Sequence, residues 1–416
     1  MNDQRASSQR CGAVRKNLLL LGAMALLSSL AARSQTLTTL YNFQGPPNDA
    51  EVPCAITPGP GGGLLGTSLW GGPSNFGTVF KIDGEGKETV VHSFTGGEDG
   101  QDPCALLASG PQGTLFGVTN SGGSGNEGAV FEIQHDQLIG AYDFVGLPAG
   151  AFPTGVTYSA GDLYGTAANG GGGQCPFGCG TIFKLDRFGH ETVLHEFQGP
   201  DGAYPGSGVV RDREGNLYGT TEGGGDNSCP NGCGTVFELD KSGNLIVMHD
   251  FTYGTGDGWF VATRVIRDSE GNLYGTTSGG GAYGFGTVYE ITNVGKERVL
   301  YSFQGPPDGA TPEQLTLAPN GNLFGVTVSG GLTQCAHSGG CGTVFKLDTR
   351  GKETVLYRFG GVTDGAAPAG NVLLDSHGNL YGTTTEGIKD GCSAFSLGCG
   401  TVWKLEVPAV QTGAAP

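Results

Sequence analysis

The sequence has few basic residues, and this scarcity excludes one class of partner. Lys and Arg together number 22 against 39 Asp and Glu, so the formal net charge is −17 at pH 7. Proteins that bind nucleic acid neutralise its phosphates with clustered Lys and Arg side chains. We therefore expect no nucleic-acid partner.

Apolar runs of membrane length are also missing. The first apolar run covers residues 18–32, which is short for a bilayer span and of the length of a secretory signal. Four basic residues precede it: Arg5, Arg10, Arg15 and Lys16. Small residues at Ala32 and Ser34 suit a signal peptidase, so we predict a signal peptide over residues 1–34 and a mature chain from Gln35; an uncleaved anchor is the alternative. No second such run follows, and we expect no membrane span in the mature chain.

A composition that favours helix is absent as well. Glycine supplies 80 and proline 21 of the 416 residues, and each interior Gly costs a helix about 1 kcal/mol relative to Ala. The glycines show no period of three, which excludes collagen, while 21 Phe and 13 Tyr are too many for a disordered chain. The composition therefore predicts a large, turn-rich, all-β protein.

Motifs of known chemistry do not occur either. The Gly-rich stretches 170–173 and 223–225 lack the Lys of a phosphate-binding loop, and no Asp-x-Asp-x-Asp-Gly calcium loop or Ser-His-Asp arrangement is present. His92, His195 and His249 occupy a position that holds Tyr in other repeats, so we expect them to serve packing and hydrogen bonding. We expect no catalytic residue, no metal and no cofactor.

What the sequence does contain is one unit repeated seven times. Each copy includes Gly-Thr-Val-Phe-Lys-Leu or a variant of it, which we call the anchor. The anchors begin at Gly77, Gly128, Gly180, Gly234, Gly286, Gly342 and Gly400. Their spacings of 51 to 58 residues are close to the period of four-stranded propeller blades and far longer than one rung of a β-helix.

Each copy is predicted to form four short antiparallel strands. The innermost follows an Asp-Gly-x-x-Pro motif, as at residues 364–368; the second is Gly-Asn-Leu-Tyr-Gly-Thr-Thr, as at residues 215–221. The anchor is the third, and Glu-Thr-Val-Leu-Tyr-x-Phe, as in residues 353–359, is the outermost. Asp and Gly between these segments favour turns. Because both faces of such sheets are apolar, we predict a seven-bladed β-propeller, in which neighbouring blades cover each other.

The ends of the repeat region predict how the ring closes. The mature chain starts with an outer-strand segment at residues 37–43 and ends with an anchor, so the last blade is expected to combine that segment with three strands from residues 366–405. This closure removes an exposed sheet edge. The predicted organisation is a signal peptide over 1–34, the propeller over 35–405 and a short C-terminal tail over 406–416.

The cysteines are expected to form disulfides. Eight of the eleven fall into close pairs just before an anchor: Cys175 and Cys179, Cys229 and Cys233, Cys335 and Cys341, and Cys392 and Cys399. Cys54 and Cys104 follow a Pro at equivalent positions of the first two repeats, and we hypothesise that they bridge neighbouring units. Zinc is the alternative for paired cysteines, but no His recurs beside them at ligand spacing. Disulfides also agree with export.

The motif set as a whole resembles a known family. Gly-Asn-Leu-Tyr-Gly-Thr-Thr, Gly-Gly, Gly-Thr-Val-Phe-Lys-Leu and Glu-Thr-Val-Leu-Tyr-x-Phe, in this order, are similar to the GloVer tandem-repeat proteins, which are exported bacterial proteins of undetermined activity. The similarity covers about residues 37–405. It implies export and a repeat fold, and it carries no catalytic residue over to this chain.

Two sets of residues are candidates for binding, on the propeller face where the Asp-Gly-x-x-Pro turns and the Gly-rich loops emerge. The first is a set of equivalent carboxylates, which we call the carboxylate ring: Asp49, Asp99, Asp201, Asp257, Asp308 and Asp364. Such a ring suits a cation or a basic ligand. The alternative is that each Asp caps its own turn.

The second set belongs to the fifth copy, which lacks the cysteine pair. It consists of Trp259, Phe260, Arg264, Tyr283 and Phe285. Arg264 is expected on the innermost strand, and aromatic rings beside a channel-lining Arg suit a sugar ring or a carboxylated glycan. The alternative is that the rings fill the volume that a disulfide closes in other blades.

These observations predict an exported propeller that acts as a binding or interaction module for a glycan or another cell-surface ligand. A secreted propeller enzyme that acts on polysaccharide, with a carboxylate of the ring as acid or base, is the alternative. We expect a monomer in the periplasm or outside the cell, whose partner is an extracellular carbohydrate or protein.

Overall fold

The structure is a computed structural model, and it describes residues 35–59, 62–146, 148–254, 256–261, 263–335, 339–361, 363–387, 392 and 398–408. The predicted signal peptide and residues 409–416 of the predicted tail lie outside the described residues. Within the described residues, no helix is both long and apolar enough to cross a membrane.

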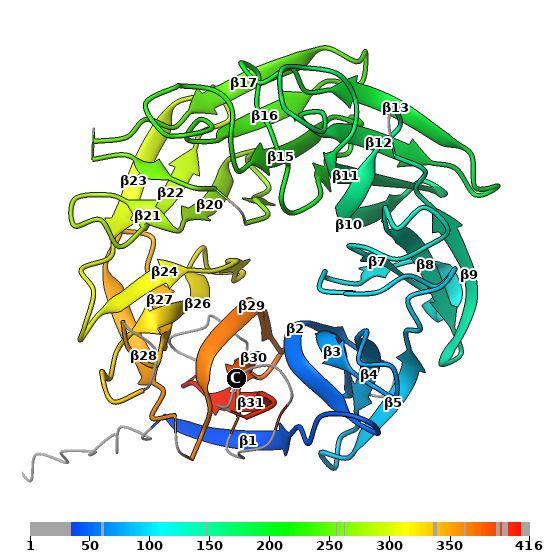
Figure 1. The fold of residues 1–416 in the computed structure, drawn as a ribbon. Coiled ribbons are helices and arrows are strands. Elements are labelled where there is room, and N and C mark those ends of the chain that lie inside the picture. Colours follow the sequence, from blue (N-terminus) through cyan, green and yellow to red (C-terminus); the bar gives the residue numbers. More distant parts are fainter. Residues whose placement is uncertain are drawn as a thin grey trace, which may run out of the picture. The chain divides into compact units, whose positions relative to one another are not determined.

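The described residues form a seven-bladed β-propeller, which confirms the predicted fold (Figure 1). Blade 1 contains β2 (Ala50–Pro58), β3 (Leu64–Gly71), β4 (Thr78–Ile82) and β5 (Glu88–Ser93). Blade 2 contains β6 (Ala108–Ser109), β7 (Leu115–Thr119), β8 (Ala129–Gln134) and β9 (Gln137–Asp143), with a 3-10 helix, η2 (Pro111–Gly113), after β6. Blade 3 contains β10 (Ala151–Ser159), β11 (Asp162–Asn169), β12 (Thr181–Leu185) and β13 (Glu191–Glu196).

The next three blades repeat this order. Blade 4 contains β14 (Val210–Arg211), β15 (Leu217–Thr221), β16 (Thr235–Leu239) and β17 (Leu245–Asp250). Blade 5 contains β19 (Ile266–Arg267), β20 (Leu273–Thr277), β22 (Thr287–Ile291) and β23 (Glu297–Ser302), plus a small sheet of β18 (Gly258–Trp259) and β21 (Gly279–Gly280). Blade 6 contains β24 (Gly309–Pro312), β25 (Thr316–Leu317), β26 (Leu323–Gly330), β27 (Thr343–Leu347) and β28 (Glu353–Arg358).

Blade 7 joins the two ends of the repeat region, as the sequence predicts. Its inner strands are β29 (Ala366–Leu374), β30 (Leu380–Glu386) and β31 (Thr401–Glu406), and its outer strand is β1 (Thr36–Asn42). β1 lies beside β31 (Figure 1) and pairs antiparallel with it. Thr36 is opposite Glu406, and Asn42 is opposite Thr401.

An aromatic pair fills the core at every junction between blades. The Phe that directly follows the outer strand of one blade contacts the third-strand aromatic ring of the next, with centroids 4.9 to 5.7 Å apart. The pairs are Phe43 and Phe80, Phe94 and Phe131, Phe144 and Phe183, Phe197 and Phe237, Phe251 and Tyr289, Phe303 and Phe345, and Phe359 and Trp403. Each ring is buried, and burying such a side chain contributes about 1.5–3 kcal/mol.

The second-strand glycine makes room for these rings. A Cβ atom added to Gly219 would lie 2.6 Å from Cζ of Phe237, and one added to Gly66 would lie 2.3 Å from Cζ of Phe80. Both separations are far below van der Waals contact. The second Gly of Gly-Asn-Leu-Tyr-Gly-Thr-Thr is therefore required for packing, because it leaves space for the aromatic ring.

The Asp-Gly-x-x-Pro motif supplies a hydrogen bond between neighbouring blades. The residue before its Pro has positive φ, such as Tyr204 at 57°, and its N–H donates to a carbonyl of the preceding blade, in this case Cys179 at 2.8 Å. The same bond recurs at every junction, from Val52, Asp102, Phe152, Phe260, Thr311 and Ala367. Positive φ is uncommon outside glycine, so the repeated backbone strain is offset by a repeated contact between blades.

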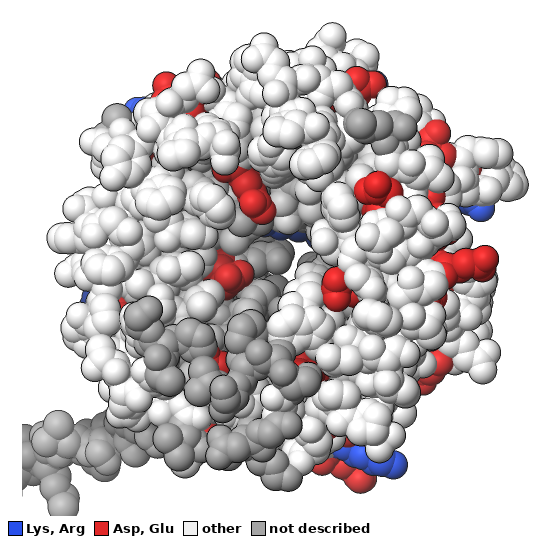
Figure 2. Space-filling model, in the orientation of Figure 1, with Lys and Arg blue, Asp and Glu red and all other residues white. Residues whose placement is uncertain are grey.

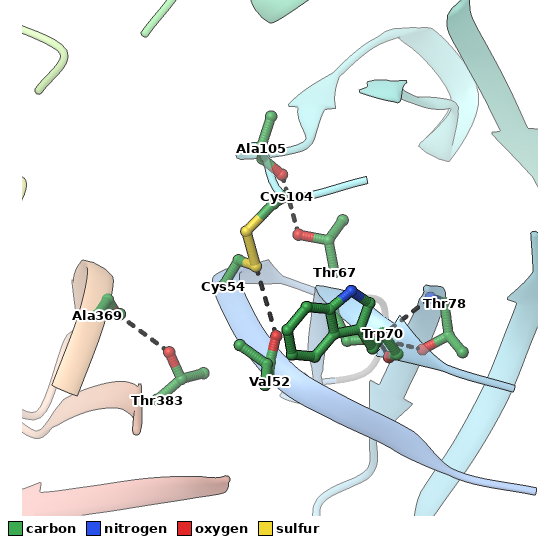
Figure 3. Close-up of a disulfide and its surroundings, with 10 residues drawn as sticks. Val52, Cys54, Thr67, Trp70, Thr78, Cys104, Ala105, Ala369 and Thr383 are labelled. Atoms are coloured by element: carbon green, nitrogen blue, oxygen red, sulfur yellow. Dashed lines mark hydrogen bonds between the residues drawn. A yellow bond between two sulfur atoms is a disulfide. The ribbon is translucent and has the colours of Figure 1, made fainter. Parts of the chain in front are cut away.

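Five disulfides reinforce the ring, and they join the pairs that the sequence suggests. Four lie within single Gly-rich loops, between cysteines four to seven residues apart. The fifth joins Cys54 of β2 to Cys104, which leads into the inner strand of blade 2 (Figure 3). Beside it, Thr67 Oγ1 donates to the carbonyl of Ala105 at 3.1 Å (Figure 3). Blades 1 and 2 are thus linked covalently near the centre of the propeller.

Candidate functional site

The members of the carboxylate ring lie in separate turns, and each bonds to the outer strand before it. Their partners are Tyr41 for Asp49, His92 for Asp99, His195 for Asp201, His249 for Asp257, Tyr301 for Asp308 and Tyr357 for Asp364, at 2.7 to 3.0 Å. Each carboxylate also accepts a backbone N–H of its own turn, as Asp201 does from Gln198 at 2.7 Å. The six carboxylates therefore cap their own turns. Turn capping is the role that the sequence analysis gave as the alternative to a ligand-binding ring.

The sequence did not reveal the pairing of these carboxylates with the Tyr or His position. The Asp position and the Tyr or His position recur together in these six repeats. This recurrence was the signal that could have revealed the pairing. The pairing depends on the backbone path of the turn, since residues such as Tyr301 and Asp308 lie seven positions apart.

The centre of the propeller holds a cavity of about 150 Å³, to which the inner segments of all seven blades contribute. Its lining includes the disulfide of Cys54 and Cys104, Thr154, Arg264 and Glu313. Figure 2 shows a hollow at this position, with acidic side chains spread around it and a small basic surface inside. The cavity lining thus includes charged residues from two different blades, Arg264 and Glu313.

Arg264 lines this cavity, but it lies in the segment just before β19 and not on the innermost strand, where the sequence analysis expected it. Its Nη2 donates to Thr157 Oγ1 at 2.6 Å and to the carbonyl of Val209 at 2.9 Å, both on other blades. Its Nε is buried without a partner, and among the described residues no carboxylate forms an ion pair with it. Burial lowers its pKa to about 10, so the guanidinium remains charged at neutral pH.

Glu313 is a second charged group of the cavity, and the sequence analysis did not single it out. Burial raises its pKa to about 7, opposed by a hydrogen bond from the backbone of Gly370. Equivalent positions hold small or uncharged residues, such as Cys54, Thr154 and Gly206. That departure from the repeat was the signal that could have identified it.

Trp259 ends the short strand β18, and the other aromatic residues of the fifth copy lie in loops. Trp259 covers Gly279 and contacts the rings of Tyr253 and Phe260 at centroid distances of 6.0 and 6.3 Å. Phe260, Tyr283 and Phe285 are 48%, 57% and 40% exposed.

The described contacts of these rings do not include Arg264. The predicted site of the fifth copy is therefore divided between the central cavity and a loop surface.

Comparison with known proteins identifies the repeat. A family model described as the Gloeobacter/Verrucomicrobia repeat matches residues 22–232 and again residues 227–412. No curated protein matches the chain.

Solved structures resemble the propeller at low sequence identity. Virginiamycin B lyase from Staphylococcus aureus is 16% identical with a TM-score of 0.58, and the match covers 90% of this chain and 99% of that one. PorZ, a surface component of the type-IX secretion system of Porphyromonas gingivalis, is 14% identical with a TM-score of 0.51, and the match covers 85% of this chain and 46% of that one. At such identities the likeness shows the fold alone.

Proposed function

The chain belongs to the Gloeobacter/Verrucomicrobia repeat family, and from this premise we propose that it is an exported binding module whose central cavity takes a carboxylate-bearing ligand, such as the acidic end of a glycan. The observation that carries this proposal is Arg264. A partly buried guanidinium without an opposite charge beside it is costly. A ligand carboxylate in the cavity would supply the missing opposite charge and offset that cost by a charge-assisted contact with the guanidinium.

The size of the cavity restricts what enters it. A volume of about 150 Å³ holds a few water molecules, so the cavity accommodates a terminal acidic group rather than a threaded polymer. The exposed rings of Phe260, Tyr283 and Phe285 are available to stack on sugar elsewhere on the surface.

Export is part of the proposal. The predicted signal peptide over residues 1–34 and the five disulfides agree with an oxidising compartment. Expression in a bacterial host, followed by mass spectrometry of the secreted or periplasmic chain, is expected to give an N-terminus at Gln35. A chain that keeps residues 1–34 contradicts cleavage.

Calorimetric titration with uronic-acid oligosaccharides and their neutral counterparts tests the ligand class. We expect Arg264→Gln to weaken binding of the acidic sugars about 10- to 100-fold, because a hydrogen bond to a charged group contributes about 1.5–3 kcal/mol. Arg350→Gln is the matched control, since Arg350 is exposed and lies outside the cavity. The proposal is refuted if wild type and Arg264→Gln bind the acidic sugars with equal affinity. It is also refuted if the wild type binds neutral sugars as tightly as acidic ones.

Glu313 supports a second candidate, a propeller enzyme that acts on polysaccharide. A carboxyl group with a pKa of about 7 that lines the same cavity as Arg264 suits general acid or base catalysis near neutral pH. The test is cleavage of the same oligosaccharides, with Glu313→Gln expected to bind but not to turn over. If the wild-type chain binds and leaves every oligosaccharide intact, the enzyme candidate fails and the binding module stands.

A further inference from the structure

One junction of the propeller gathers three metal-ligating side chains. His249 lies on β17 of blade 4, Asp257 follows in the turn towards blade 5, and Glu297 begins β23 of blade 5. One ligand atom from each of the three residues lies within 4.8 Å of the others. We propose that these residues form a binding site for a divalent transition-metal cation of the zinc class.

The separations suit one shared cation. His249 Nε2 and Asp257 Oδ2 are 3.0 Å apart, and two ligand atoms of a tetrahedral zinc site with bonds of about 2.0–2.1 Å lie about 3.3 Å apart. Glu297 reaches the same point at the end of a flexible side chain, and its Oε1 is buried without a partner. A cation therefore satisfies an oxygen that the protein leaves unbonded.

The surroundings fix the first two ligands and leave a route for the cation. Asp257 Oδ1 accepts the N–H of Gly258 at 2.7 Å, and the ring of His249 packs edge-on against Phe251. Such outer contacts orient metal ligands. The His249 side chain is 20% exposed and that of Asp257 12%, so a cation from solvent can reach them.

The repeat provides an internal comparison, because the same three positions occur at the other junctions. Three of them pair a tyrosine with the glutamate of the next blade: Tyr41 with Glu88, Tyr142 with Glu191, and Tyr301 with Glu353. Burial raises the pKa of each of these phenols above its ordinary value, and a protonated phenol is a poor ligand.

The histidines at two other junctions, His92 and His195, lack the third ligand. His92 bonds to Asp99 and His195 to Asp201. In the register of the outer strand, Leu138 and Leu245 stand where blade 5 has Glu297. A histidine and a glutamate thus meet only between blades 4 and 5 among the described junctions.

The negative charge of this junction favours a cation as well. Asp250, next to His249, adds a third carboxylate, and burial together with the charge of Asp257 raises the pKa of Glu297. Tyr289 places a buried, unpartnered hydroxyl near both carboxylates, whose charges add to burial in raising its pKa. One imidazole and two carboxylates, with a fourth position left open, are ligands that zinc accepts.

Titration of Zn²⁺ into the untagged full chain in a Cys11→Ser background, chosen so that no free thiol competes, tests the proposal. We expect one tight Zn²⁺ per chain by calorimetry and by elemental analysis after dialysis. His249→Tyr and Glu297→Leu are suitable variants, because each installs a residue that the chain itself carries at the equivalent position. Both are expected to lose more than about 100-fold in affinity, since loss of even an outer partner of a metal ligand costs about 10–100-fold.

Two further variants make the test decisive. His195→Tyr removes a histidine that has no glutamate opposite it, and we expect it to leave zinc binding unchanged. Tyr301→His places a histidine beside Asp308 and Glu353, and we expect the stoichiometry to rise from one Zn²⁺ to two. No tight Zn²⁺ in the reference chain, or equal affinity after Glu297→Leu, overturns the proposal.

Discussion

At the scale of single residues, the glycine of the second strand shows how the repeat constrains its own sequence. Its hydrogen side chain allows an aromatic ring from the third strand to lie directly on the backbone, as Phe237 does at Gly219. An Ala at this position meets the ring itself, which is fixed by the neighbouring blade. The glycines of the repeat are thus part of its core.

Gly219→Ala is predicted to destabilise the fold by about 1–3 kcal/mol, the usual cost of overpacking a core. Gly140→Ala is the matched control, because nothing lies within 4 Å of a Cβ added there and Gly140 is not among the positive-φ residues. Urea denaturation of both variants measures the difference. Equal midpoints for the two variants contradict the packing account.

A buried carboxyl group at the start of an outer strand predicts a dependence of stability on pH. Burial, with the charge of Asp308, raises the pKa of Glu353 to about 7. Between about pH 4.5 and 7 the folded state therefore holds a proton that the unfolded chain has lost, and stability falls as pH rises. We expect the wild type to lose stability relative to Glu353→Gln across this window in thermal melts. If the difference in stability between wild type and Glu353→Gln stays constant from pH 4 to 8, the predicted pH dependence is wrong.

At the scale of structural elements, each junction combines an aromatic pair with a hydrogen bond from a left-handed residue. Tyr204 illustrates the second contact, since its φ of 57° directs its N–H to the carbonyl of Cys179. That carbonyl belongs to a cysteine whose disulfide shapes the Gly-rich loop. The loop and the turn therefore determine each other's conformation.

The disulfides are predicted to differ in their contribution to stability. Cys54 and Cys104 close a loop of 50 residues, whereas Cys175 and Cys179 are four residues apart. Loop-closure entropy gives about 4 kcal/mol for the first and about 2 kcal/mol for the second. Denaturation of two variants, each with both cysteines of one disulfide replaced by Ser, compares the two contributions. If loss of the short-loop disulfide lowers the free energy of unfolding more, the stabilisation is not entropic in origin.

At the scale of the whole molecule, the repeat made the fold predictable and left most of the site unpredictable. The period, the strand motifs and the split last blade are local patterns, and they led to seven blades and to the closure by β1. They also placed Arg264 on the inner side of blade 5. The departure of Glu313 from the repeat is visible in the sequence, but its environment is created by the other blades, so the sequence alone did not show that it lines a central cavity.

The loops account for the other part of the site that the sequence did not predict. Contacts of Gly-rich segments depend on backbone conformations that glycine makes too numerous to foresee. For this reason the aromatic residues of the fifth copy and Arg264, grouped together by the sequence analysis, have separate contacts in the structure.

Closure of the ring is predicted to keep the molecule monomeric. Removal of residues 35–43 uncovers the edge of β31, and unpaired strand edges recruit other chains. We expect light scattering to show oligomers of the shortened chain, and a synthetic peptide of residues 35–43 to restore the monomer by adding the missing strand. A shortened chain that stays monomeric without the peptide contradicts this account.

The pairing of β1 with β31 also orders events during biosynthesis. Of the described strands, the first along the chain, β1, has as its partner the last, β31. At about 5–20 residues per second, β1 waits roughly 20 to 70 seconds for that partner. Blade 7 is therefore completed only after β31 has been made.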